Sequence, residues 1–439
     1  AEKWDELTSR MNSGNLSADE FKHINEELAT FKQEVKAAGL DSGAFFRKMG
    51  DQIRLVVTQW ISLNAVIGKT RDMVSNVIEI DTAMTNLKKV TNETSRTYNQ
   101  FADRAIAKAK ELKIGYADLI NQSAEWAKRG YDLNEAMELS TSSGIYSVVG
   151  EVDNATAVQH LTTVMKSYNM TVDESIDIVD KFNNISNKYS VNASDIGAML
   201  TNSISSLSVA GNTLDQAIAM GTTISEITGG ASEAGNTLKV LSMRLRGAKT
   251  EIENAGESTD GMAESTSKLR DQIKALTNVT GNGGFDIMLD ENTFKSTYDI
   301  MKGISEVWDD INGTNQSALI ELIAGKQRGN TVSALLTNMA QADDILQDSL
   351  NSAGSAVKEY ENHLNSTESK IQGFKTAFED LSDTIINGDF LKTAIDSGTK
   401  LINILDTIIN DVGILPTLIG AIVGGLSFKG VGRPKTEYA

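Results

Sequence analysis

The chain contains no cysteine and only three histidines, His23, His160 and His363, which lie far apart in the sequence. The absence of cysteine excludes disulfides, thiolate metal sites and a cysteine nucleophile. No histidine stands in an HExxH or HxH arrangement, so zinc chemistry and histidine acid–base catalysis lack their usual side chains. The sequence also lacks a Walker loop, a GxSxG elbow and a dinucleotide-binding fingerprint. We therefore predict a protein without catalytic residues, metal site or cofactor.

Proline is almost absent from the chain. Residues 1–415 contain none, and the two prolines are Pro416 and Pro434, whereas an average protein uses ~5%. Proline interrupts helices and is common in the turns of other fold classes, so its absence favours helix. Aromatic residues make up only 6% of the chain, which predicts an aliphatic core. We predict an all-α fold, a multi-helix bundle with coiled-coil segments and one small β-hairpin near 285–295.

The chain has fewer basic than acidic residues, 41 Lys and Arg against 59 Asp and Glu, so its net charge is −18 and its pI is about 4.7. A nucleic-acid-binding protein needs clustered Lys and Arg, so we predict no specific nucleic-acid binding. Ala1 already lies within a charged helical pattern and no signal peptide opens the chain. We therefore expect a fragment or a processed product.

Helix starts are marked by capping boxes, in which two side chains satisfy free backbone amides. They occur at Ser17–Glu20, Thr171–Glu174 and Thr213–Gln216. Apolar residues follow each box at steps of three and four, the spacing of one buried helix face. Gly229-Gly230 is predicted to end the helix that begins after Thr213.

Composition divides the chain into five segments. The stretch 251–290 is rich in Gly, Ser, Thr and Asn, which is typical of a loop or flexible joint. No GK[ST] follows its glycines, and the spacing of Asp286, Asp290 and Asn292 does not match a calcium loop, so turn and cap roles are expected. The predicted segments are a helical and coiled-coil segment at 1–75, a helical core domain at 76–250, the joint at 251–290, a helical and coiled-coil region at 291–410, and an apolar segment with a polar tail at 411–439.

A heptad register runs through residues 357–385. Such a seam favours helix–helix association, either as a bundle within one chain or as a coiled coil between copies. The predicted seam residues are Val357, Tyr360, Leu364, Ile371, Phe374, Phe378, Leu381 and Ile385.

Long apolar runs are few. The stretch 50–68 falls short of the ~20 apolar residues of a membrane span, so we predict a buried core helix. The stretch 412–428 is free of charge and contains Gly420-x-x-x-Gly424, a small-residue pattern of paired membrane helices. A core or oligomer contact and conditional membrane insertion both remain open for it. The predicted contact residues are Ile414, Leu418, Gly420, Ile422 and Gly424.

Short motifs follow one another in a fixed order between residues 77 and 410. They are Ile80–Val90, Glu111–Gly115, Glu125–Gly130, Val152–Ala157, Ser194–Leu207, Ala210–Leu214, Gly229–Leu238, Arg244–Arg246, Trp308, Leu319–Gly325 with Lys326 and Arg328, and Gly354–Ala356. This series resembles the core region of tape-measure proteins from tailed phages and prophages. Members of that family are usually longer, with large coiled-coil or enzymatic tails, so this piece alone does not account for a whole-length ruler.

The resemblance implies a structural protein that sets tail length during assembly and is released during DNA ejection. Copies would lie in the lumen of the tail tube of the virion, after assembly in the host cytoplasm. The implied partners are the tail tube protein, tail tip or hub proteins, further copies in a homotrimer or hexamer, and the host membrane. As one continuous helix the chain would span ~660 Å.

Two other functions stay open at this point. The apolar stretches 50–68 and 412–428 would suit a membrane-active helical protein, such as a pore-former or an injection-particle component. A cell-wall hydrolase is the second, because some tape-measure proteins carry such domains. The lack of Cys and HxH excludes the commonest peptidases, which leaves a glutamate-based transglycosylase.

Overall fold

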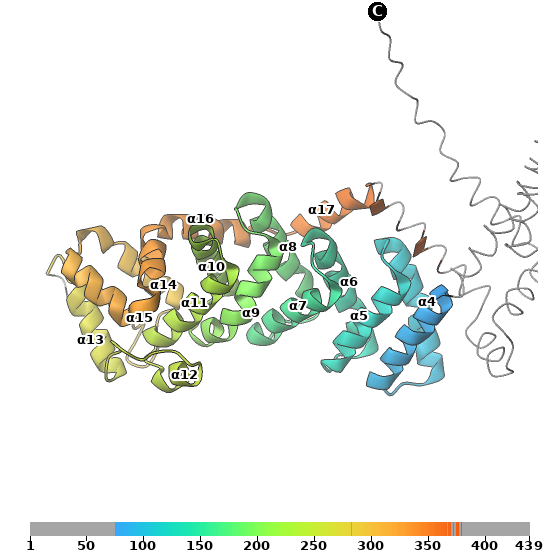
Figure 1. The fold of residues 1–439 in the computed structure, drawn as a ribbon, viewed down its shortest axis with the longest axis horizontal. Coiled ribbons are helices and arrows are strands. Elements are labelled where there is room, and N and C mark those ends of the chain that lie inside the picture. Colours follow the sequence, from blue (N-terminus) through green and yellow to red (C-terminus); the bar gives the residue numbers. More distant parts are fainter. Residues whose placement is uncertain are drawn as a thin grey trace, which may run out of the picture. The chain divides into compact units, whose positions relative to one another are not determined.

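The computed structural model describes residues 75–281 and 283–366, together with the helical residues Glu368, Ser369, Gln372, Lys375, Thr376 and Glu379. Nearly all of them belong to one compact unit, Glu79–Leu381 (Figure 1). The second unit, Ala1–Ile78 with Ser382–Ala439, lies almost entirely outside the described residues. The regular elements of the described residues are helices, so the predicted all-α class is confirmed.

The helices follow one another through the described chain with short connections. The first occupies residues 75–90. The others are α4 (Ser95–Leu112), α5 (Tyr116–Lys128), α6 (Leu133–Val149), α7 (Asn154–Tyr168), α8 (Ser175–Lys188), α9 (Ala193–Val209), α10 (Leu214–Thr228), α11 (Ala231–Leu245), α12 (Lys249–Asn254), α13 (Thr266–Leu276), α14 (Thr297–Ser305), the 3-10 turn η1 (Trp308–Asp310), α15 (Gly313–Thr337), α16 (Met339–Leu350) and α17 (Ser355–Leu364).

The chain reverses its course after α15. Up to α11, neighbouring helices pack mainly on helices close to them in sequence, such as α5 on α6 and α9 on α11. The helix α16 then runs back against α10 and α8, and α17 continues against α8 and α6 (Figure 1). Helices far apart in sequence therefore lie side by side along this return path.

The helix ends follow local sequence rules in most places. The predicted capping box at Thr213 and Gln216 is confirmed, and Gly229 ends α10 in the left-handed conformation with φ 70°. At Thr171 the prediction was only half right. The Glu174 carboxylate accepts a hydrogen bond from Thr171 N, but α8 begins after Glu174 rather than after Thr171. The box predicted at Ser17–Glu20 lies outside the described residues.

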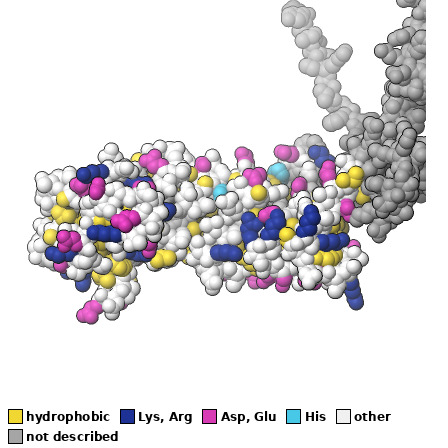
Figure 2. Space-filling model, turned by 60° about the horizontal axis from the view of Figure 1, so that its bottom comes forward, with side chains coloured by type: hydrophobic (Ala, Val, Ile, Leu, Met, Phe, Trp, Pro, Cys, Tyr) yellow, Lys and Arg dark blue, Asp and Glu magenta, His cyan; other side chains and the backbone are white. Residues whose placement is uncertain are grey.

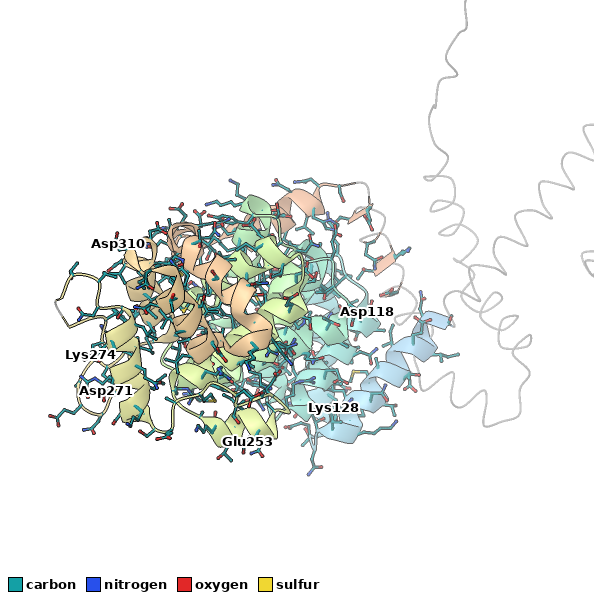
Figure 3. All side chains as sticks on the ribbon, turned by 60° about the vertical axis from the view of Figure 1, so that its left-hand side comes forward. Asp118, Lys128, Glu253, Asp271, Lys274 and Asp310 are labelled. Carbon is teal, nitrogen blue, oxygen red and sulfur yellow. The ribbon has the colours of Figure 1, made fainter. Side chains whose placement is uncertain are left out.

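Apolar side chains form one main core that runs from Leu112 to Tyr360. A smaller core is built by the helix at 75–90, α4, α5 and the start of α6. The predicted boundaries at 250 and 290 fall inside the main core, to which Leu269 and Ile273 of α13 contribute. The segment predicted as a joint thus contains α12 and α13, whose outer faces expose Glu253 and Asp271 (Figure 3).

The hairpin predicted near 285–295 is present in a minimal form. Met288 and Phe294 form an isolated antiparallel bridge, and the Leu289 amide donates to Thr293 O at 2.8 Å. The Asp290 carboxylate accepts from the amides of Asn292 and Thr293. This is the turn role that the spacing predicted.

Within the described part of the chain, no helix combines the length and the apolar character that a membrane crossing requires. The apolar stretches 50–68 and 412–428 lie outside the described residues. So do Ile414, Leu418, Gly420, Ile422 and Gly424, the contact residues predicted in the second stretch.

Candidate functional site

A buried arginine joins α11 to the segment that follows α12 and to the distant helix α15. Arg244 of α11 is 2% exposed. Its Nε donates to Leu322 O at 3.3 Å, and its Nη2 donates to Glu321 O at 3.2 Å and Asp260 O at 2.6 Å. Its Nη1 donates to Ser258 O at 3.0 Å. Because a buried guanidinium must have its donors satisfied, these carbonyls are what allow the charge to be buried. Burial lowers the pKa of Arg244, with the nearby Arg328 adding to the effect.

The carbonyls that Arg244 binds on α15 lie just before a break in that helix. Gly325 has φ 71° and ψ 178°, so α15 is two helical halves joined at this residue. The carbonyls of Glu321 and Leu322 end the first half, where helical partners run out. Arg244 supplies the missing donors. A Cβ on Gly325 would lie 3.1 Å from Arg244 Nη1, and few side chains tolerate this backbone conformation.

An ion pair closes the same region from outside. Arg328 binds Glu257 through two parallel hydrogen bonds of 2.9 and 2.6 Å, the strongest geometry for this pair. A cavity of about 190 Å³ beside it is lined by Arg244, Glu257, Gly325 and Lys326, among others. Ligand sites are usually larger, ~300 Å³ or more. We call Arg244, Glu257, Gly325, Arg328 and the four carbonyls the arginine hub.

The motifs quoted for the family resemblance meet in and around this hub. Arg244 comes from one motif, and Gly325 and Arg328 come from another. A third motif contributes Gly235, where α11 crosses α9 so closely that a Cβ would lie 2.5 Å from Met199 O. Trp308 is buried, and its carbonyl accepts from the Gln316 side chain at 2.8 Å. These residues serve packing and helix ends.

A second cluster of polar contacts fastens α17 to α8. The Asp180 carboxylate, 4% exposed as a residue, accepts from Gly354 N at 2.7 Å and from Ala356 N at 2.9 Å. The Asn183 side chain donates to Ser355 Oγ at 2.9 Å. A carboxylate on one helix thus caps the first turn of another, at the motif Gly354–Ala356.

The helix α16 is fastened to α8 in a similar way. The Asp348 carboxylate accepts from Lys188 Nζ at 2.6 Å and from Tyr189 OH at 2.8 Å. The ammonium group of Lys188 is the main reason why the pKa of Asp348 lies below its usual value. Deeper in the structure, Lys181 Nζ binds Asp215 at 2.6 Å.

The turn between α4 and α5 is held by residues about 250 positions downstream. Tyr360 OH donates to Leu112 O, and Lys113 Nζ donates to Leu364 O at 2.5 Å. The Thr376 hydroxyl donates to Ile114 O at 2.8 Å. The Tyr116 amide donates to the Glu379 carboxylate at 2.7 Å. Together with the contacts to α8, these bonds close the unit.

The first three residues of the predicted seam lie on α17, and two of them, Tyr360 and Leu364, take part in this closure. Val357 is 39% exposed, whereas Tyr360 is 4% exposed. Leu364 is partly buried against the main core and is the last residue of α17, which Asn365 caps. Ile371, Phe374, Phe378, Leu381 and Ile385 lie outside the described residues. Association between copies through this seam therefore stays a prediction.

The surface near α4 and α5 is more basic than the whole chain. Residues 88–129 contain nine Lys and Arg against five Asp and Glu, a net charge of +4 in a chain of −18. Figure 2 shows basic side chains gathered over this part of the unit. Some of them are paired, since Lys128 and Arg129 both bind Glu125, at 2.5 and 3.1 Å. Exposed pairs of this kind contribute little to stability.

The sequence analysis named Arg244, Gly325, Arg328 and Gly354–Ala356 only as parts of the family resemblance, and it did not name Asp180 or Asp348. Asp180 and Arg244 each interrupt an apolar helix face, and a charge in such a position is a usable signal. Asp348 gives no such signal, because it lies in a polar stretch of α16. His160 was noted only as isolated, yet its Nδ1 lies 3.0 Å from Tyr146 OH in the core.

Comparison with known proteins finds one matching family. Residues 105–325 match the model of the phage-related minor tail proteins, from within α4 to the break at Gly325. This match covers half of the chain, and the chain belongs to that family. Proteins of this family are structural components of phage tails. No solved structure matches the chain.

Proposed function

We propose that the chain is the tape-measure component of a phage tail, which sets tail length during assembly and leaves the tail when DNA is ejected. Family membership supports a tail component, and the ordered motifs support the tape-measure assignment. In this proposal copies lie in the tube lumen while tube protein polymerises around them. Tail tip or hub proteins hold one end of the tape.

One observation carries the proposal beyond the family. The unit Glu79–Leu381 is closed by non-covalent polar contacts between helices that are remote in sequence, at the arginine hub and along α8. The chain has no cysteine, and no proline before Pro416. Nothing covalent therefore prevents the helices from separating, and no proline prevents them from joining end to end.

The proposal also implies that the compact unit opens, because its separate helices are much shorter than a continuous helix of the same residues would be. The longest unbroken helix with described bounds, α4, has 18 residues, which corresponds to ~27 Å. Residues 79–381 as one continuous helix would span ~450 Å. In this proposal the ruler works in the opened state, and the compact unit is the form before assembly.

Tail length after deletion of residues 357–385 tests this proposal. Loss of these 29 residues should shorten each tail by ~44 Å if they form helix in the tape, measured by electron microscopy of particles. The matched control replaces the same residues with an unrelated proline-free helical sequence of equal length, and should restore the parental length.

Tails of parental length and normal infectivity in the deletion variant would contradict the ruler role of this segment. They would favour a membrane-active helical protein that acts through 412–428. Leakage of dye from liposomes, caused by the purified chain, would then be the measurement to make.

A further inference from the structure

The helix α17 is held differently from the helices of the core. In α11, ten of fifteen residues are buried, whereas in α17 only Ala356 and Tyr360 are buried among ten. Burial of apolar surface is the main stabilising term of a folded unit. The attachment of α17 therefore depends on its polar contacts.

Those contacts lie at the two ends of α17. At its start Gly354 has φ 77° and offers no side chain to cap the helix, so Asp180 of α8 provides the cap. Near its end Tyr360 OH binds Leu112 O, and Leu364 O accepts from Lys113 Nζ. Between them, Glu359 accepts from Asn187 at 2.5 Å on the exposed surface. With the bond from Asn183 to Ser355, the contacts named here are six hydrogen bonds, and little apolar burial adds to them.

The arginine hub has the opposite character. Arg244 is among the largest fully buried side chains and donates to four carbonyls of two other segments. Separating these segments exposes the apolar contacts of α11 with α9 and α15 as well. The hub also lies almost wholly inside the family match of residues 105–325, while α17 lies beyond it.

We infer that α17 is a detachable strap, which leaves α8 and the α4–α5 turn before the arginine hub opens. Its release is the first step of the opening on which the proposed function rests. The step uncovers Leu112 O and the Asp180 carboxylate. It also widens the cavity of about 490 Å³ that Asn184, Gly354 and Asn362 help to line between α8 and α17.

Hydrogen exchange of the whole purified chain, followed by mass spectrometry, tests the strap. Amides of α17 should exchange through an opening that leaves α11 protected. Asp180→Asn and Tyr360→Phe each remove part of the attachment, so exchange in α17 should become about five- to tenfold faster, as expected for one hydrogen bond. Exchange in α11 should stay within about twofold. Asp173→Asn, on the exposed side next to α8, is the control and should change neither.

A chemical lock gives an independent measurement, because the chain has no cysteine of its own. Lys113→Cys and Asn365→Cys, joined by a short bismaleimide, should slow exchange in α17 and leave α11 unchanged. Equal exchange rates in α17 and α11 in the parent and in every variant would overturn the strap, because they indicate a single all-or-none opening. The measurement uses free protein, so a failure of the ruler test in tails leaves its result standing.

Discussion

At the scale of single residues, this chain uses buried polar groups to join segments that are far apart. Arg244 binds carbonyls in two segments besides its own, and Asp180 caps a helix about 175 positions downstream. Burying a charged or polar side chain costs free energy, and burying it without its hydrogen-bonding partner costs more. They therefore specify which segments meet.

Replacement of Arg244 by Leu should lower the free energy of unfolding by ~3–5 kcal/mol, because the buried Leu322 carbonyl and three partly buried carbonyls lose their donor. Urea denaturation followed by circular dichroism measures the loss. Arg246→Leu is the matched control, since Arg246 bonds mainly within its own neighbourhood, to Ser242 O and Glu251. It should cost ~1 kcal/mol or less. Equal losses in the two variants would remove the special role of Arg244.

His160 should make the stability of the unit depend on pH. Burial lowers the pKa of His160, so the folded state prefers the neutral ring, whereas the unfolded chain takes up a proton below its ordinary pKa of ~6.5. The unfolded state then binds more protons, and the free energy of unfolding falls as the pH drops below ~6.5. Urea midpoints between pH 7.5 and 5 should show this slope. The slope should be smaller in His160→Gln, and an unchanged slope there would assign the effect to other groups.

At the scale of elements, most helix ends follow from neighbouring residues, while the break in α15 does not. Thr213 and Gln216 bond to each other's backbone within one turn, so their box could be recognised locally. The break at Gly325 has no comparable local cause. It is matched by Arg244, 81 positions upstream, which binds the carbonyls just before it.

Gly325→Ala should destabilise the unit by ~1–3 kcal/mol, since alanine is strained at this φ and its Cβ would press on the Arg244 guanidinium. Gly313→Ala is the control in the same helix. A Cβ added at Gly313 would meet no atom within 4 Å, so this substitution should be neutral or stabilise the unit by up to ~1 kcal/mol. Thermal denaturation of both variants measures the difference. A neutral result for Gly325→Ala would mean that the break in α15 is not required by the hub.

At the scale of the whole molecule, the ruler role predicts how tail length changes with the number of residues deleted. If opened helices join into one tape, deletions anywhere in 79–381 should shorten tails along one line of ~1.5 Å per residue. A unit that stayed compact inside the tail would instead contribute a fixed length, and small deletions would leave the tails unchanged. The slope therefore separates an opened tape from a folded domain carried within the tail.

The sequence by itself determined the helical class, because the lack of proline and the apolar spacing act within a few residues. It also determined the hairpin turn at Asp290 and several helix ends, which depend on neighbours in the chain. Only the tertiary structure decided the arginine hub, the break at Gly325 and the return of α16 and α17 along α8. Those features join groups tens to hundreds of positions apart, and no local pattern records which distant carbonyl or amide a buried charge will meet.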